Sequence, residues 1–368
     1  MKFKLIDKYI FNQIFGASFV CIALFMIVWI APETLVNIIK AVSVKTMTVS
    51  EGLKCVLFSM PLVLSKALPV GIFLGCLYSF DRMSKDSELT VIRGCGINFW
   101  RILVIPILLG IVFAVLCFFV SDRMVPFATK NLYKIRKEVQ WNHFVYALKD
   151  ENNNMLQLIL LKQYDTQDNK SDLIVLNFNR KNISKISILS DIIISKKVVM
   201  SDLKWDLYNN TQYVIKYDGV FEDVKYPEKL SILYGKKAQI TQQLMKYNLK
   251  RDRELTNKEL KKYLRILKDE EINDLYNLNL NFYLQRFFHS AMCIIFAILG
   301  CLLGYSNPRE QRLIGFTIAI GIIFLYFMSL PFFNLMAEKQ ILSPYITASI
   351  QPIAAGFLIY FYKKYKGL

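Results

Sequence analysis

A short polar segment between two apolar stretches carries the residues best suited to bind a partner protein. It reads DRMSKDSELTVIRGCG over residues 81–96. Asp86 or Ser87 is predicted to cap a short helix, and Glu88 lies in its first turn, where the helix dipole favours a negative charge. The same helix carries Leu89, Ile92 and Arg93, followed by Gly94 and Gly96. The pattern predicts a docking helix whose Glu88 pairs with a basic residue of a cytoplasmic partner. The alternative is a segment that only connects the two apolar stretches and binds no partner.

A second candidate is Lys66, which interrupts a long apolar stretch between Pro61 and Pro69. A charge near the middle of a membrane helix costs a few kcal/mol, so ionisable residues there usually line a cavity or pair with an opposite charge. The sequence therefore predicts that Lys66 faces a cavity and binds an anionic group. Two alternatives need no ligand: the side chain extends to the membrane surface, or it pairs with a nearby carboxylate.

Motifs for catalysis are absent from the sequence. The Gly-Lys pair at residues 235–236 lacks the flanking residues of a phosphate-binding loop, and the Gly-Cys-Gly at residues 94–96 lacks the third glycine of a dinucleotide fingerprint. No Cys-x-x-Cys pair occurs, and His143 and His289 are far apart, so neither a metal site nor a cofactor is expected. Energy for any transport would come from another subunit or from an ion gradient.

Six stretches almost free of charge lie between the polar segments. Hydrophobic residues make up 54% of the 368 residues, above the range of soluble globular proteins. A stretch of about 20 apolar residues crosses the hydrocarbon core of a bilayer as a helix. The stretches cover residues 9–32, 55–80, 102–121, 287–308, 313–337 and 340–362. The sequence therefore predicts six transmembrane helices and excludes a disordered chain or a small disulfide scaffold.

The distribution of charge predicts the orientation in the membrane. Basic residues are denser in residues 1–8, 81–101, 309–312 and 363–368 than in residues 33–54 and 338–339. Because cytoplasmic loops are richer in Lys and Arg, we expect both termini in the cytoplasm and residues 122–286 outside it. The net charge of +17 favours an anionic partner. Outside the cytoplasm, anionic headgroups or phosphorylated glycolipids are better candidates than nucleic acid, and the alternative is a basic surface that only aids solubility.

The region outside the cytoplasm is predicted to be mainly β-structure. Short apolar runs over about residues 142–242 are separated by turn residues such as those at 209–210 and 218–219. Short strands at this spacing are typical of an antiparallel sandwich or jellyroll. None of the seven cysteines lies in residues 122–286, so this fold must hold without disulfides.

Helices are predicted on both sides of the β-structure. The third apolar stretch continues outward with Lys130 and Lys134 on one face. Thr256 and Glu259 form a capping box that predicts a helix over about residues 256–271. The predicted divisions are residues 1–121 with three transmembrane helices and the docking helix at about 81–98, residues 122–286 with the β-jellyroll, and residues 287–368 with three further transmembrane helices.

Residues 68–110 resemble a signature of the lipopolysaccharide-export permeases, the LptF/LptG family. The shared features are a Leu-Pro pair in the second stretch, the run D-S-E-L followed by Arg and Gly, and an Arg and a Pro that enter the third. A Trp-x-Leu-x-Asn phrase at residues 205–209 also matches. Met83 replaces a Leu of the pattern, Cys95 falls within its Ala-x-Gly part, and residues 300–304 lack the Pro of the family's G-x-P-L-G.

The resemblance implies an α-helical membrane protein with six transmembrane helices and an inserted periplasmic antiparallel β-jellyroll. It implies a permease of the bacterial inner membrane that forms a heterodimer with a paralogous permease and binds a cytoplasmic ATPase dimer (LptB-like). Lipopolysaccharide would be extracted from the membrane and passed to periplasmic jellyroll bridge proteins (LptC/LptA-like). The chain itself would not be an enzyme, because its partner hydrolyses ATP. Which paralogue it is stays open.

The candidate residues then fall into two groups. The ATPase-coupling group is Asp86, Glu88, Leu89, Ile92 and Arg93. Lipid A is phosphorylated, so basic residues near the outer surface are candidate contacts through charge-assisted hydrogen bonds. This substrate-binding group is Lys40, Lys45, Lys66, Lys130, Lys134 and Arg136. One alternative function is a membrane-anchored scaffold whose β-domain binds a partner protein and transports nothing. A third, an ion-coupled transporter, has few ionisable residues within the spans to support it beyond Lys66 and His289.

Overall fold

The computed structural model divides the chain into two compact units, which are treated separately. A helical unit comprises Met1–Lys137 and Asp252–Leu368, and a β unit comprises Glu138–Arg251. The residues that the structure describes are 5–136, 144–149, 155–164, 170–180, 187–201, 204–216, 218–248, 254–306 and 313–365.

Six helices in the described residues are long and apolar enough to cross a membrane, which confirms the predicted transmembrane helices. They are α1 (Leu5–Ile30), α3 (Val49–Lys85), α5 (Phe99–Phe119), α9 (Asn273–Gly304), α10 (Leu313–Glu338) and α11 (Pro344–Tyr365). The π-helical turn η2 (Val120–Met124) joins α5 to α6 (Val125–Arg136), so the third span continues as a helix as predicted. The shorter elements are η1 (Ala31–Leu35), α2 (Val36–Ser43), α4 (Glu88–Gly94) and α8 (Asn257–Asp269).

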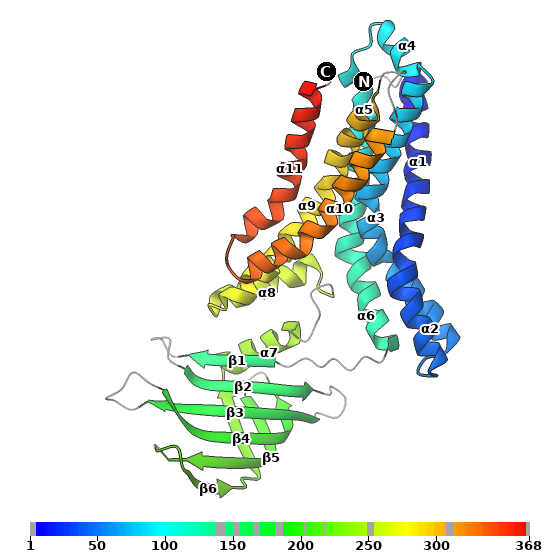
Figure 1. Cartoon of the computed structure of the whole chain (residues 1–368). Helices are drawn as coiled ribbons and strands as arrows, with labels where there is room; N and C mark the ends of the chain where they lie inside the picture. Colours follow the sequence, from blue (N-terminus) through cyan, green and yellow to red (C-terminus); the bar gives the residue numbers. More distant parts are fainter. Residues whose placement is uncertain are drawn as a thin grey trace. The chain divides into compact units, whose positions relative to one another are not determined.

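The helical unit has two distinct ends (Figure 1). At one end α1 begins, α11 ends and α4 lies across the ends of the long helices. At the other end lie α2, α6 and α8. The predicted capping box of α8 is confirmed, since Thr256 accepts from the backbone N–H of Glu259 and the Glu259 carboxylate accepts from the backbone N–H of Thr256.

The long helix α3 is packed between α1 and α9 through two pairs of glycines. A Cβ on Gly71 or Gly75 would lie 2.1 Å from an atom of Ile22 or Ser18 of α1. A Cβ on Gly300 or Gly304 of α9 would lie 2.4 Å from a backbone carbonyl oxygen of α3. Each pair has the small-xxx-small spacing that lets membrane helices approach closely. The GCLLG run of α9 therefore has a packing role even without the Pro of the family pattern.

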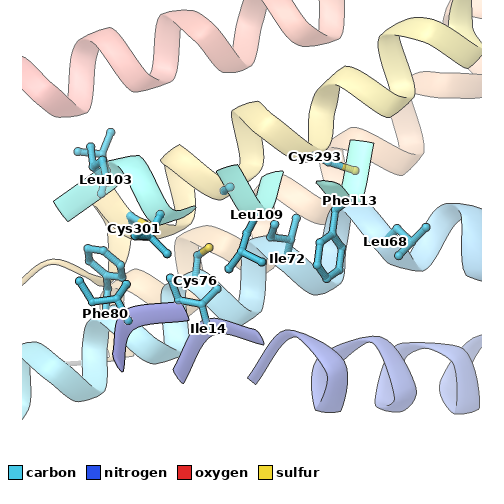
Figure 2. Packing of buried hydrophobic residues seen from close by; sticks show 14 of the residues in the cluster. Ile14, Leu68, Ile72, Cys76, Phe80, Leu103, Leu109, Phe113, Cys293 and Cys301 are labelled. Atoms are coloured by element: carbon cyan, nitrogen blue, oxygen red, sulfur yellow. The ribbon is translucent and has the colours of Figure 1, made fainter. Parts of the chain in front are cut away.

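The core of the helical unit lies around α3. Figure 2 shows part of it: Cys76 and Phe80 of α3 lie near Cys301 of α9, while Leu103 of α5 and Ile72 of α3 lie elsewhere in the same cluster. All five side chains are at most 2% exposed. The helices α10 and α11, in contrast, have only 11% and 17% of their most apolar windows buried within the chain. Their remaining apolar surface is suited to lipid or to another membrane subunit.

The β unit contains one antiparallel sheet, as predicted. Its seven strands pair in sequence order from β1 to β6, and β7 pairs with β5. The strands are β1 (Phe144–Lys149), β2 (Met155–Tyr164), β3 (Lys170–Arg180), β4 (Ser187–Met200), β5 (Lys204–Ile215), β6 (Phe221–Lys225) and β7 (Lys229–Tyr234). The helix α7 (Lys236–Asn248) follows β7 and contacts β1, β5 and β7.

A row of buried apolar side chains crosses the sheet. Tyr146 is opposite Ile159, Ile159 is opposite Val175, and Val175 is opposite Ile193. All four side chains are at most 8% exposed. Apolar residues of α7, including Leu244, are buried as well. The β unit therefore has its own hydrophobic core, which fits the absence of cysteine from its sequence.

The prediction of a turn at residues 209–210 is wrong, because β5 continues through them as one strand. Asn209 has a φ of 55° and makes a local irregularity within β5. The first half of β5 pairs with β7, where Trp205 is opposite Ile232, and the second half pairs with β6, where Tyr213 is opposite Val224. Asparagine tolerates a left-handed backbone better than most residues, so it suits this position.

Ion pairs and hydrogen bonds also join β5 to β7. The Asp206 carboxylate accepts from the Ser231 hydroxyl at 2.5 Å and lies 3.0 Å from the Lys229 ammonium. Ser231 and then Lys229 hold the pKa of Asp206 below its ordinary value. These contacts stabilise the charged carboxylate on β5, between β4 and β7.

The glycine contacts between α3 and α9 give a first prediction. We expect Gly300→Leu to lower the free energy of unfolding by about 1–3 kcal/mol, the usual cost of overfilling a packed core. Its Cβ would meet the Phe73 carbonyl oxygen, which cannot move without shifting α3. Thermal unfolding in detergent measures the change. The control is Gly16→Leu on α1, where no atom lies within 4 Å of the added Cβ. Equal melting of the two variants would contradict the assigned packing role.

Candidate functional site

The short helix α4 begins directly after α3. Ser87, one of the two predicted caps, occupies the N-cap position of α4, but its side chain makes no capping hydrogen bond. Asp86 instead ends α3 and lies 3.8 Å from Arg82, while Ser87 has a left-handed backbone with a φ of 59°. This reversal turns the chain between the two helices and places Glu88 at the first position of α4.

The first residue of α4 is hydrogen-bonded to α1. The Tyr9 hydroxyl lies 2.9 Å from both carboxylate oxygens of Glu88. Gln13, one turn along α1, donates to the Tyr9 hydroxyl at 3.2 Å. The Tyr9 hydroxyl, itself held by Gln13, therefore orients the Glu88 carboxylate, whose side chain remains partly exposed.

The other end of α4 is bonded to the end of α9. Arg93 Nη1 donates to the Tyr305 hydroxyl, and the guanidinium carbon lies 5.4 Å from the centre of the Tyr305 ring. The same ring lies 5.1 Å from that of Phe99 in α5. The structure therefore places the Arg93 guanidinium on Tyr305.

The middle of α4 packs into the helical core. Leu89 is 1% exposed, and Ile92 is partly buried against the same cluster. The sequence analysis assigned both residues to the ATPase-coupling group, and the structure packs their side chains against the chain itself. Val91 is 64% exposed and points away from this core. The sequence contains a signal for this, because Leu89 and Ile92 are three residues apart and share a helix face that Val91 does not.

An ion pair joins α1 to α5. Arg101 Nη2 of α5 lies 2.7 Å from the Asp7 carboxylate of α1, and the Asp7 side chain is only 7% exposed. Sequence reasoning missed this pair, as well as Tyr9 and Tyr305. These residues lie far from α4 in the sequence, so no periodic pattern connects them with it.

Lys66 lies in α3 beside an aromatic cluster. Its ammonium nitrogen lies 4.6 Å from the centre of the Trp29 ring in α1. Trp29 in turn contacts Phe25 of α1 and Phe327 of α10, with ring centres 5.5 and 5.2 Å away. A cation over an aromatic face is stabilised by the ring quadrupole, most strongly where water is excluded. This contact offsets part of the cost of a charge within the span.

The residue next to Lys66 accepts hydrogen bonds from two other helices. Pro69 has no N–H, so the Ser65 carbonyl four residues earlier lacks its helical donor. His289 Nε2 lies 3.0 Å from this carbonyl oxygen, and the Cys117 thiol donates to it at 3.4 Å. Because a carbonyl can only accept, Nε2 carries the proton, and in the neutral ring Nδ1 accepts from the Tyr326 hydroxyl. The network joins α3, α5, α9 and α10.

The other predicted substrate contacts lie at the end of the helical unit opposite α4 (Figure 1). Lys40 and Lys45 are exposed at the end of α2 and just beyond it. Lys130 and Lys134 are exposed on α6. The side chain of Arg136 lies outside the described residues. These side chains and Lys66 therefore come from three helices, α2, α3 and α6, and from the turn after α2.

In the described part of the chain, no three His, Cys, Asp or Glu side chains are grouped so that they could hold a metal ion. The candidate residues thus comprise the short helix α4 at one end of the helical unit, a polar network within the spans, and basic side chains at the other end. The exposed lysines can form charge-assisted hydrogen bonds with anionic groups.

A comparison with family models gives a match over nearly the whole chain. The model of the lipopolysaccharide export system permease LptF/LptG matches residues 8–364. The chain belongs to the LptF/LptG family. No curated protein matches this permease. Its six apolar helices and inserted antiparallel sheet agree with the family's fold, and the family is that of the permease of lipopolysaccharide export. A permease subunit of this kind is a multi-pass membrane protein and not itself an ATPase.

The His289 network of the permease gives a second prediction. We expect His289→Leu to lower the free energy of unfolding by about 1–3 kcal/mol, because the Tyr326 hydroxyl loses its partner and the Ser65 carbonyl keeps only a weak thiol donor. Thermal unfolding in detergent measures this loss. His289→Gln retains a donor and an acceptor and should be milder. Similar melting of His289→Leu and the parent protein would show that the network does not stabilise the helical unit.

Proposed function

We propose that this chain is the permease subunit of an ABC-type exporter that extracts lipopolysaccharide from the inner membrane, driven by a separate cytoplasmic ATPase. The observation that carries the proposal is the placement of α4. This helix is hydrogen-bonded to α1 and α9, buries Leu89 in the core, and leaves Val91 exposed. A rigidly attached helix with a half-exposed carboxylate is suited to receive motion from a partner.

The proposed orientation places α4 and both termini in the cytoplasm and the β unit in the periplasm. The excess of Lys and Arg in the segments near α4 supports this orientation. The proposed partners are an LptB-like ATPase dimer at α4, a paralogous permease beside the helical unit, and LptC/LptA-like jellyroll proteins at the β unit. The largely uncovered apolar surfaces of α10 and α11 support a second membrane subunit.

The proposed substrate contacts are basic side chains that would bind the phosphates of lipid A. Charge-assisted bonds to phosphate are among the stronger hydrogen bonds in proteins. The contacts are Lys40, Lys45, Lys130, Lys134 and Arg136 near the periplasmic surface, together with Lys66 within α3. Exposure of the four lysines on α2, α6 and the turn after α2 supports this assignment.

Affinity purification from native membranes tests the proposed function. We expect the chain to retain an ATPase subunit, and the complex to contain bound glycolipid and hydrolyse ATP. A preparation that retains only periplasmic proteins, with neither ATPase activity nor glycolipid, would favour a non-transporting scaffold instead.

The proposed role of Glu88 gives a third prediction. Glu88→Lys would place two cations together at the contact with the ATPase, and we expect export to fall by roughly tenfold or more, the effect of about 1.4 kcal/mol. Glu88→Gln keeps the shape and should be milder, with Glu88→Ala between the two. Export and ATPase activity are measured at matched membrane abundance. Normal assembly and export in Glu88→Lys would rule out the coupling role.

A fourth prediction concerns Lys66. A photo-crosslinking amino acid at position 66 should capture glycolipid in membranes, because the proposal places this side chain in the substrate path. The control is the same amino acid at Leu57, which is 55% exposed on α3 and should capture ordinary phospholipid. Capture of phospholipid alone at position 66, with glycolipid present, would mean that Lys66 faces bulk lipid.

A further inference from the structure

We propose that Tyr9 and Tyr305 are positioning residues that carry motion of α4 to α1 and α9, and that their hydroxyl groups are needed to couple ATP use to extraction. The proposal rests on the proposed function, since it requires that α4 receives motion from an ATPase. It assigns this role to two residues outside the α4 segment that lie 79 and 212 residues from their partners in sequence.

The two tyrosines hold opposite ends of α4. Tyr9 binds Glu88 at the first residue of the helix, and Tyr305 binds Arg93 one residue before its end. With Leu89 buried between them, α4 has three attachments along seven residues. Both charged residues are therefore oriented by hydroxyl groups of other helices. A displacement of α4 must move α1 and α9 or break these bonds.

The two helices that the tyrosines connect to α4, α1 and α9, extend to the polar groups within the spans. The 26-residue helix α1 starts close to Tyr9 and carries Trp29, which contacts Lys66. The 32-residue helix α9 ends beside Tyr305 and carries His289, which binds the Ser65 carbonyl. The contacts of α1 and α9 therefore reach two adjacent residues of α3, Lys66 and Ser65. Because α1 and α9 both pack closely against α3, two bonds at α4 can act on one place in the span.

The contacts around the tyrosines favour transmission over simple anchoring of α4. The Asp7–Arg101 pair already fixes the start of α1 to α5, and Ser84 of α3 already donates to the Gly304 carbonyl of α9. These helices thus hold together without the tyrosine hydroxyls. The hydroxyls add a connection of α1 and α9 to α4.

The test uses Tyr9→Phe and Tyr305→Phe, which remove only the hydroxyl groups. Phe at 305 keeps the ring beside Arg93 and Phe99. The matched control is Tyr78→Phe on α3, because Tyr78 is 50% exposed and its hydroxyl makes no hydrogen bond to any described residue. The first measurement is hydrogen exchange of the full chain in detergent. We expect the amides of Val91 and Cys95, which donate to Ser87 and Val91, to exchange roughly fivefold faster in both variants than in the control.

The second measurement is the amount of glycolipid extracted per ATP hydrolysed by the complex purified with its ATPase. We expect a decrease of roughly fivefold in each variant, at the low end of couplings between distant sites. A variant with normal extraction per ATP would overturn the proposal for that tyrosine, whether or not exchange becomes faster. Unchanged exchange would also overturn it, since the hydroxyl would then not hold α4.

Glu88→Lys, measured in parallel, separates this proposal from the proposed function. If Glu88→Lys uncouples the complex while both tyrosine variants behave like Tyr78→Phe, α4 is the coupling helix but the tyrosines do not carry its motion. If Glu88→Lys also leaves extraction per ATP unchanged, α4 is not the coupling helix and both assignments are wrong.

Discussion

The close approach of α3 to its two neighbours is the constraint on which the helical unit depends. Where a glycine of α9 faces an α3 carbonyl, no side chain separates the backbones, and the same holds for α3 and α1 on the other side. In lipid, helix association depends on such packing, because the hydrophobic effect supplies no force between apolar helices there. The positions of α1 and α9 relative to α3 then determine which side chains meet at both ends and within the span.

The polar contacts occur where this packing brings backbone or side-chain groups together. The Ser65 carbonyl is available because Pro69 follows it, and it is reached by His289 only because α9 lies against α3. Lys66 similarly meets Trp29 because α1 lies on the other side. A charge and an unpaired carbonyl would each be costly in a membrane, and neighbouring helices supply a compensating group for both.

Features that depend on local sequence were predictable. Six apolar stretches gave six helices, the Thr256 and Glu259 pair gave a capped helix, and short apolar runs gave an antiparallel sheet. The turn predicted at residues 209–210 is wrong, because β5 continues through them and stays paired with β4. Ser87 lies at the N-cap of α4 as one of the two predicted caps, but in a left-handed conformation without a side-chain hydrogen bond. Tyr9, Tyr305 and the Asp7–Arg101 pair were not predictable, since their partners are set by tertiary packing.

The irregularity at Asn209 has a consequence for how the β unit opens. It divides β5 into two halves, one paired with β7 and the other with β6. All five residues of β6 are exposed, whereas β7 includes the buried Ile232 and Leu233. Local opening follows the number of buried contacts that must be broken. The β6 edge can therefore separate and re-form on its own, while β7 unfolds only together with the core, so that a single strand supports one labile and one durable neighbour.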